Sequence, residues 1–372
     1  MSGSPRAVEA AEKLARLRER MGRRGARAAV LGRAANFAWL SGGGRSFIAV
    51  TAETGAAWLV VDEHAVTVVA NNIEAARLRE EELAGLDWEV RSCDWWEPGG
   101  LARLARELTG DPAGVLADGT VPGAIDGSAD LAELRTTLGQ AERTRAAAVG
   151  RDTAEALEAA CRNCRPGETE FALVGRLAAE CYARGIEPVL HLAAADGRAA
   201  LRRHPLPTEA PVRQYALVAA CGMRGGLVVS CTRLVHFGPP SDDLRRRWQA
   251  CAAVDAAMIS ATRPGATAGQ IFDVAVRSYA AAGFAGEWRF HHQGGLAGYA
   301  SREWRAEPGG LPVVGPGQIF AWNPSVAGTK SEDTILVGAG APRILTETGA
   351  WPLAAFEPEP GVIVRRPQIL VL

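Results

Sequence analysis

Two adjacent histidines, His291 and His292, stand in front of a pair of glycines in the segment FHHQGGLAGY. Imidazole side chains bind metal ions, and they exchange protons near neutral pH because a free histidine has a pKa of about 6.5. The glycines let backbone and ligand approach each other closely. In an extended segment neighbouring side chains point to opposite faces, so we expect only one histidine to face a shared site. A turn that carries two ordinary core histidines is the alternative.

The cysteines offer a second arrangement that could bind a metal ion. Cys161 and Cys164 form a C-x-x-C pair inside a helical pattern, and no second pair completes a zinc site. The chain has seven cysteines, and it opens with a charged helical pattern rather than the apolar core of a signal peptide. An odd number of scattered cysteines favours reduced thiols. We therefore expect two thiols on a helix face and a cytoplasmic protein.

Composition is typical of a globular protein and excludes some functions. Of the 372 residues, 48% are hydrophobic and 22% are charged, and the formal net charge is −1. The basic residues are dispersed, so the sequence offers no electrostatic footprint for nucleic acid. No apolar run approaches the ~20 residues that a membrane-spanning helix needs. Two domains are expected, because single cores stop growing at about 250–300 residues.

The first third of the chain alternates β-rich runs with helical patterns, which indicates a small α/β domain. The expected strands are ARAAVLG, SFIAVTA, AAWLVVD, AVTVVAN, WEVRSC and GVLADG, and the expected helices are IEAARLREEEL and LARLARELTG. A long helical stretch then opens at DGSADL, with Asp126 or Ser128 as its cap. We therefore expect an N-terminal domain at 1–130 and a C-terminal domain at 131–372.

Two helical segments of the second domain share the same opening. RPGETEFALVGRLAAECYARG and, further along, RPGATAGQIFDVAVRSYAAAGF both start with Arg-Pro-Gly-x-Thr and stop at a glycine, with Thr169 as the expected cap of the first. Apolar strands follow each copy: YALVAACG and GLVVSCTRLVHFG, then QIFAWNPSV and TILVGAG. This internal duplication predicts two α-β halves that build one curved sheet, with helices outside and a site at the pseudo-twofold centre.

Together these patterns resemble the creatinase, prolidase and methionine aminopeptidase family (peptidase M24) of pita-bread enzymes. NFAWLSGG is similar to the signature of the family's N-terminal domain, and the paired RPG-x-T helices are similar to its duplicated helices. VVGPGQIFAWNP followed by KSEDTILV has the spacing of its last two metal-binding strands. The resemblance covers nearly the whole chain. It implies an α/β (α+β) fold, in which a creatinase-like domain precedes a pita-bread domain, and a homodimer.

The resemblance also implies that most metal ligands of the family are replaced. Its peptidases hold two divalent ions with two aspartates, a histidine and two glutamates. The aspartate positions fall on Ala220 and Ser230, and the first glutamate position falls on Asn323. A pair of close cations needs bridging carboxylates to offset their mutual repulsion. We therefore expect no two-metal site and no cofactor.

The remaining two ligand positions are kept. The histidine falls on His292, or on His291 after a shift of one, and the last glutamate is Glu332. A single zinc ion bound through His292 and Glu332, with Cys231 or Ser230, is the alternative to a site without metal.

Creatinase, within this family, hydrolyses a guanidino C–N bond without a metal by means of a histidine and glutamates. Its catalytic histidine corresponds to His204 in RRHPLP. The resemblance thus implies catalysis by His204, His292 and Glu332. Around them we expect a set of substrate-binding residues: His291, Gln293, Asn323, Ser230, Arg203, Tyr299 and Arg302.

Three functions remain open. The first is a metal-independent hydrolase that cleaves a C–N bond in a small amino-acid-like or guanidino/amidino substrate. The second is a non-catalytic binding module, which would have a closed or apolar centre. The third is an Xaa-Pro aminopeptidase-like metallopeptidase with divergent ligands. The paired histidines and the polar inner strands favour the first, and no motif selects the substrate.

Overall fold

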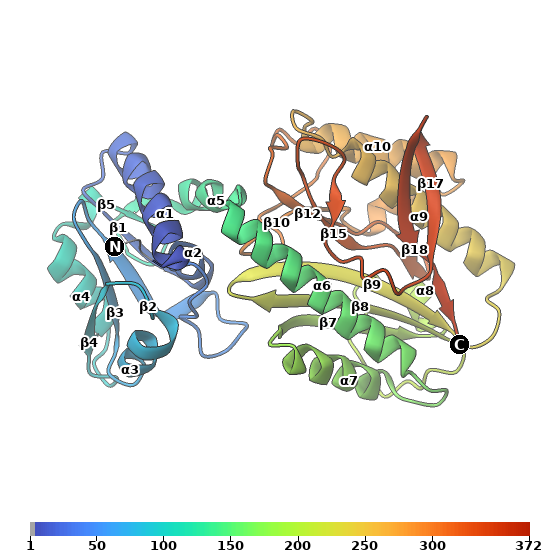
Figure 1. Cartoon of the computed structure of the whole chain (residues 1–372), viewed down its shortest axis with the longest axis horizontal. Coiled ribbons are helices and arrows are strands. Elements are labelled where there is room, and N and C mark those ends of the chain that lie inside the picture. Colours follow the sequence, from blue (N-terminus) through green and yellow to red (C-terminus); the bar gives the residue numbers. More distant parts are fainter. Residues whose placement is uncertain (1–3) are drawn as a thin grey trace. The chain divides into compact units, whose positions relative to one another are not determined.

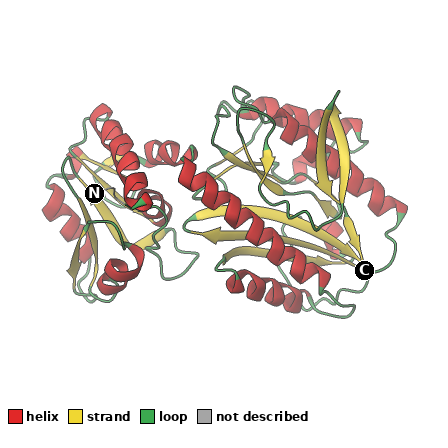
Figure 2. Ribbon diagram, viewed as in Figure 1, coloured by secondary structure: helices red, strands yellow, loops and turns green. Residues whose placement is uncertain are grey.

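The computed structural model describes residues 4–372 (Figures 1 and 2). The chain divides into two compact units, Met1–Ala141 with Gly225–Leu227 and Glu142–Arg224 with Val228–Leu372. Each unit combines helices with its own sheets, so the expected mixed α/β fold is confirmed.

The N-terminal unit is built on a six-stranded mixed sheet with the order β4-β3-β2-β1-β5-β6. Its strands are β1 (Ala28–Arg33), β2 (Thr54–Val61), β3 (Val66–Asn71), β4 (Glu89–Cys93), β5 (Val115–Ala117) and β6 (Ile125–Asp126). Its helices are α1 (Pro5–Arg23), α2 (Ala34–Leu40), α3 (Ala75–Arg77), η1 (Leu78–Glu82), α4 (Gly100–Thr109), η2 (Pro112–Gly114) and α5 (Ser128–Thr136). Apolar side chains of β1, β2, β3 and β5 pack against α4 to form its core.

Two sequence predictions for this region are wrong. The segment SFIAVTA forms no strand, since residues 46–52 are bends and turns and Ile48 is 74% exposed. A run whose central apolar side chain lies in solvent has no face to bury against a sheet. The long helical stretch is broken at residues 137–139, where α5 ends and α6 (Gln140–Arg162) begins. The cap of α5 is Gly127, and Asp126 accepts the Ser128 N–H at 3.0 Å.

The C-terminal unit contains two main sheets, with the orders β19-β9-β8-β7 and β11-β10-β12-β15-β16. The strands of the first are β7 (Glu187–Ala195), β8 (Tyr215–Arg224), β9 (Leu227–His236) and β19 (Ile369–Val371). Those of the second are β10 (Gly294–Ala297), β11 (Trp304–Arg305), β12 (Ile319–Trp322), β15 (Asp333–Leu336) and β16 (Arg343–Ile344). Two further pairs are β13 (Ser325–Val326) with β14 (Thr329–Lys330) and β17 (Leu353–Glu359) with β18 (Val362–Pro367).

The helices of this unit carry the predicted duplication. Besides α6 they are α7 (Glu170–Ala183), α8 (Arg198–Leu201), α9 (Asp242–Ala261), α10 (Ala268–Ala281) and η3 (Glu287–Phe290). Thr169 and Thr267 cap α7 and α10, which have 14 residues each, by accepting a backbone N–H. Each threonine also pairs with a later residue through an isolated antiparallel bridge, Thr169 with Pro211 and Thr267 with Val313. The two halves therefore repeat their contacts as well as their sequence.

The two sheets meet where β9 passes the start of β15. The Thr232 N–H donates to the Glu332 carbonyl at 3.0 Å. Thr334 Oγ1 accepts the Ser230 N–H at 2.8 Å and donates to the Ser230 carbonyl at 3.0 Å. The single curved sheet expected from the sequence is therefore two sheets linked at this point, and the link brings Ser230, Thr232 and Glu332 together.

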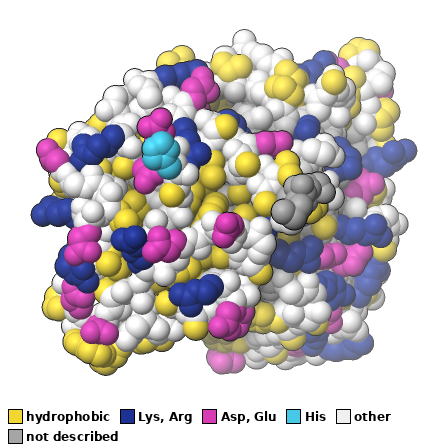
Figure 3. Space-filling model, turned by 60° about the vertical axis from the view of Figure 1, so that its left-hand side comes forward, with side chains coloured by type: hydrophobic (Ala, Val, Ile, Leu, Met, Phe, Trp, Pro, Cys, Tyr) yellow, Lys and Arg dark blue, Asp and Glu magenta, His cyan; other side chains and the backbone are white. Residues whose placement is uncertain are grey.

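Charges of both signs are interspersed on the face shown in Figure 3, where Lys and Arg side chains alternate with Asp and Glu side chains around apolar patches. No helix within residues 4–372 is both long and apolar enough to cross a membrane.

Gly295 gives a test of the packing between β10 and β11. A Cβ atom at this position would lie 2.0 Å from the Trp304 carbonyl oxygen and 2.8 Å from the Arg305 Cα atom. We expect Gly295→Ala to lower the free energy of unfolding by about 1–3 kcal/mol in urea titrations, because backbone must move. The control is Gly175→Ala in α7, where an added Cβ meets nothing; it should raise stability by about 0.5–1 kcal/mol. Equal stability of the two variants would contradict the described pairing.

Candidate active site

A cavity of about 290 Å³ opens in the C-terminal unit. Its apolar wall is formed by Val189, Leu190, Leu192, Leu206 and Ala219. Its polar wall is formed by His204, Cys221, His292, Ser301, Arg302, Arg305, Asn323, Lys330 and Glu332. These side chains come from β7, β8, the loop after α8, and the strands and loops around β10, β11, β12, β14 and β15. Figure 1 labels β7, β8, α8, β10, β12 and β15. Every residue expected to be catalytic therefore faces this one cavity.

Glu332 lies at the base of the polar wall with only 3% of its surface exposed. One carboxylate oxygen, Oε1, is 3.1 Å from Arg302 Nη2. The other, Oε2, is 2.7 Å from Lys330 Nζ and accepts the Thr232 hydroxyl at 2.8 Å. Burial raises the pKa of Glu332, but the charges of Lys330 and Arg302 outweigh it and hold that pKa below its usual value. Glu332 is thus a carboxylate whose two oxygens are each paired with a cation.

Three histidines, His204, His291 and His292, form a second cluster of polar side chains. His204 Nε2 and His291 Nε2 are 3.1 Å apart, so one of them donates and the other accepts a hydrogen bond. His291 Nδ1 lies 3.1 Å from Ser325 Oγ, which fixes the His291 ring. His292 Nδ1 accepts the Gly294 N–H at 3.2 Å. The neutral form of His292 therefore carries its hydrogen on Nε2.

These three histidines are held in the neutral form. The pKa of His204 and of His291 is lowered and that of His292 falls to about 3, and loss of solvation is the largest cause for each, even for His204, which is exposed at the surface. Positive neighbours add to the effect: Lys330 for His204 and His291, and Arg302 for His292. Neutral imidazoles at pH 7 can accept or donate a proton in the cavity.

Half of the residues expected from the sequence lie behind the cavity wall. His291 is only 7% exposed and reaches the cavity through its bond to His204. Gln293 is fully buried and accepts a hydrogen bond from the Tyr279 hydroxyl. Ser230 Oγ lies 3.1 Å from the sulfur of Cys221, and Cys221 rather than Ser230 lines the cavity.

Arg203 and Tyr299 also lie outside the lining. Arg203 forms an ion pair with Glu287 and donates to Ser325 Oγ at 3.1 Å, so it acts on the histidine cluster through Ser325. The Tyr299 hydroxyl donates to Glu142 at 2.6 Å. Among the expected residues, those that line the cavity are His204, His292, Arg302, Asn323 and Glu332.

Two cationic residues of the lining were missed by sequence reasoning. Lys330 lies two residues before Glu332, and alternation along the strand would have placed both on one face. Arg305 follows Arg302 by three residues in a loop and a two-residue strand, where no periodicity indicates a direction. The assignment of the first aspartate position to Ala220 also needs correction, because Ala220 packs in the core while Ala219 and Cys221 face the cavity.

A two-metal centre does not fit these residues. The lining places Ala219, Cys221 and the amide of Asn323 where carboxylates would be needed, and Lys330 and Arg302 already pair with both oxygens of Glu332. Divalent ions of this kind need anionic oxygen ligands.

The histidine cluster is a separate candidate for a metal ion. His204, His291 and His292 have ligand atoms within 4.8 Å of one another, the one such group found within residues 4–372. The hydrogen bond from Gly294 leaves the proton on His292 Nε2, and the cations Lys330 and Arg302 lower the pKa of these histidines. Positive charge that opposes an imidazolium also opposes a divalent cation, so the cluster fits neutral imidazoles better than a bound ion.

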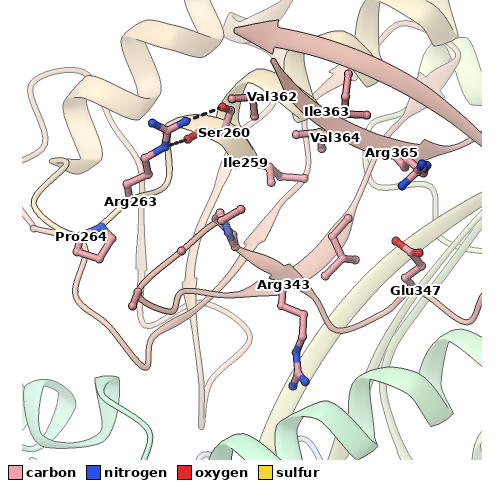
Figure 4. Close-up of a pocket in the computed structure, with 15 residues that line it drawn as sticks. Ile259, Ser260, Arg263, Pro264, Arg343, Glu347, Val362, Ile363, Val364 and Arg365 are labelled. Atoms are coloured by element: carbon pink, nitrogen blue, oxygen red, sulfur yellow. Dashed lines mark hydrogen bonds between the residues drawn. The ribbon is translucent and has the colours of Figure 1, made fainter. Parts of the chain in front are cut away.

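A larger cavity of about 640 Å³ lies elsewhere in the same unit (Figure 4). It is lined by the end of α9, the loop before β16, and β18, and Arg263 there donates to the Ser260 carbonyl at 2.8 Å. Its lining residues include neither a histidine nor a cysteine. The smaller cavity is therefore the candidate active site.

The sequence matches two family models. Residues 144–339 match the metallopeptidase family M24, and residues 13–119 match the creatinase/prolidase N-terminal domain. The chain belongs to the M24 family of metallopeptidases. This is a family of hydrolases, and the resemblance drawn from the sequence is confirmed. No curated protein is significantly similar to the chain in sequence.

Solved structures show the same fold over the whole length. The dipeptidase PepE of Mycobacterium ulcerans has a TM-score of 0.77 at 19% identity, covering 100% of this chain and 99% of its own. The X-Pro aminopeptidase of Thermotoga maritima has a TM-score of 0.76 at 16% identity, covering 96% and 99%. The prolidase of Pyrococcus horikoshii has a TM-score of 0.74 at 16% identity, covering 91% and 98%. At these identities the similarity establishes the fold.

The neutral histidines predict an acid-sensitive fold. Unfolded histidines bind protons below a pKa of about 6.5, whereas the lowered pKa values keep His291 and His292 neutral in the fold. Below that pH the unfolded chain binds more protons than the folded chain. Each time the pH is lowered by one unit, the free energy of unfolding therefore decreases by about 1.4 kcal/mol for each such histidine. We expect His291→Asn to reduce the dependence of the free energy of unfolding on pH, measured in urea titrations between about pH 6 and 5, by the contribution of about one proton. The control is the exposed His64→Asn; identical slopes for wild type and His291→Asn would contradict the interpretation.

Proposed function

We propose that the protein is a metal-independent hydrolase that cleaves a C–N bond in a small, amino-acid-like substrate. The observation that carries this proposal is the pairing of both Glu332 oxygens with Lys330 and Arg302 in the cavity that also holds His204 and His292. The cations beside Glu332 are the side chains of Lys330 and Arg302, and the neutral imidazoles of His204 and His292 supply the acid–base chemistry.

In the proposed reaction His204 is the general base. Its neutral imidazole takes a proton from water while the water oxygen bonds to the acyl carbon, and it returns the proton to the nitrogen when the C–N bond breaks. His291 holds the His204 ring in place through the hydrogen bond between their Nε2 atoms, which are 3.1 Å apart. Proton transfer of this kind contributes about 10²- to 10⁴-fold to the rate.

Lys330 and His292 stabilise charge in this reaction. Lys330 has three N–H donors and uses one for Glu332 Oε2, so others remain for the carbonyl oxygen on which negative charge develops. His292 presents its Nε2 hydrogen to the cavity. Glu332 keeps Lys330 and Arg302 in place, so we regard it as a positioning residue.

The charges of the cavity favour one of the two substrate classes. Arg302, Arg305 and Lys330 outnumber Glu332, the carboxylate of the lining. A guanidino or amidino cation would therefore be repelled, and an anionic amino-acid derivative would be attracted. The polar lining of the cavity is evidence against a binding module with a closed apolar centre. Ala219 and Asn323, which carry no carboxylate, are evidence against a divergent metallopeptidase. The homodimer implied by the resemblance stays part of the proposal.

Substitution of His204 tests the catalytic assignment. We expect His204→Ala to lower kcat by about 10²- to 10⁴-fold against amide and N-acyl amino acid substrates, because the general base is removed. His64→Ala, at an exposed position, is the matched control and should keep full activity. Full activity of His204→Ala would show that another group takes the proton.

Metal content tests the independence from metal. Protein purified without added metal is expected to contain less than one divalent ion per chain by elemental analysis, and a chelator should leave kcat/KM unchanged. A chelator cannot remove Lys330 or Arg302, which supply the positive charge beside Glu332. Two tightly held ions per chain, or activity that returns only with added metal, would overturn the proposal.

A further inference from the structure

Two polar atoms in the cavity wall lack a hydrogen-bond partner. They are Arg302 Nε, a donor, and Asn323 Oδ1, an acceptor, and both are buried. Asn323 as a whole is only 3% exposed. A buried polar atom without a hydrogen-bond partner is unfavourable, because it has lost its hydrogen bonds to water. Because both residues line the candidate active site, a ligand there that offers one acceptor and one donor would satisfy them together.

The acceptor that fits Arg302 is an anion. Arg302 and Arg305 both line the cavity, and Arg305 is exposed at the surface. Arg305 forms no ion pair with any residue in 4–372, whereas Arg302 pairs with Glu332. Guanidinium groups bind planar carboxylates through paired N–H···O bonds. These two arginines of the lining therefore suit a substrate carboxylate.

The donor that fits Asn323 is a neutral N–H. A free ammonium group would bring a further positive charge next to Lys330 and Arg302, where the histidines are already kept neutral. An amide N–H donates the same hydrogen bond without this charge. The lining also includes aliphatic side chains, among them Val189, Leu190 and Leu192, which suit an apolar group on the same molecule.

We propose that the substrate is an N-acyl amino acid, whose carboxylate is bound by Arg302 and Arg305 and whose amide N–H is accepted by Asn323. The cleavage of this substrate rests on the proposed function, whereas its binding rests on the residues of the lining alone. In the reaction water adds to the acyl carbon and the acyl C–N bond breaks. The nitrogen takes up a proton, and the products are a carboxylic acid and a free amino acid.

Binding of matched compounds tests the substrate class separately from catalysis. The His204→Ala protein is titrated by calorimetry with four compounds: N-acetyl-L-leucine, its methyl ester, its N-methyl derivative and glycyl-L-leucine. Together they test the carboxylate, the amide N–H and the effect of an ammonium group. We expect the acid to bind at least about tenfold tighter than the ester, because the ester lacks the charge that strengthens hydrogen bonds from the arginines. The N-methyl derivative, which lacks the N–H, and the dipeptide, which carries an ammonium group, should both bind more weakly than the acid.

Variants then locate the carboxylate. In the same background Arg305→Met should weaken binding of the acid about tenfold or more and leave the ester unchanged. Arg202→Met is the matched control, because Arg202 is exposed, lies outside the lining and bonds only the carbonyl of Leu201. Thermal unfolding of each variant checks that the fold is kept.

The outcomes separate the two proposals. Equal binding of acid and ester, tighter binding of the dipeptide, an unchanged affinity in Arg305→Met, or no binding of any compound overturns the substrate assignment. Preferential binding of the acid that depends on Arg305 supports it. If wild type binds the acid in this way and releases no leucine from it, the substrate assignment stands as a binding specificity and the proposed hydrolysis is wrong.

Discussion

The pairing of one buried carboxylate with two tethered cations is the interaction on which the site depends. Glu332 sits where the two sheets meet, and its backbone carbonyl accepts the Thr232 N–H that links them. A carboxylate with 3% exposure is unstable without compensation, and Lys330 and Arg302 supply it at 2.7 and 3.1 Å. Burial is the largest cause of the lowered pKa values of the neighbouring histidines, and the same two cations lower these pKa values further.

A second ion cluster supports the first from behind. Asp333, the next residue along the strand, points away from the cavity and pairs with Arg233 at 3.0 Å and Arg366 at 2.7 Å. Both arginines are almost fully buried, and Arg366 also pairs with Asp255. Adjacent acidic residues thus hold opposite faces of one strand, Glu332 in the cavity and Asp333 in the core. Removing one partner of a buried ion pair leaves the other charge buried without compensation, so the fold loses more stability than the intact pair contributes. The ion pairs of Asp333 therefore hold this strand in one position.

Features that depend on local chemistry could be predicted from the sequence. The caps at Thr169 and Thr267 and the repeat of their helices follow from side chains that satisfy backbone donors within one turn. The presence of His204, His292 and Glu332 in one cavity required the family resemblance, since residues far apart in the chain show no shared periodicity.

Features that depend on packing could not be predicted in the same way. The segment around Ile48 reads as a strand, but neither sheet nor core covers it. The choice between Ala219 and Ala220 depends on a register that only the paired strands fix. The direction of Arg305 depends on a loop, and the position of His291 behind His204 depends on Ser325, far away in sequence.

The placement of Lys330 opposes the creation of a metal site in this cavity by a single substitution. A carboxylate introduced at position 323 alone would enter a cavity where the ammonium group of Lys330 already pairs with Oε2 of Glu332. The new acid would then form one more salt bridge instead of a coordination sphere. Several residues would have to change together before a divalent ion gained an adequate set of oxygen ligands.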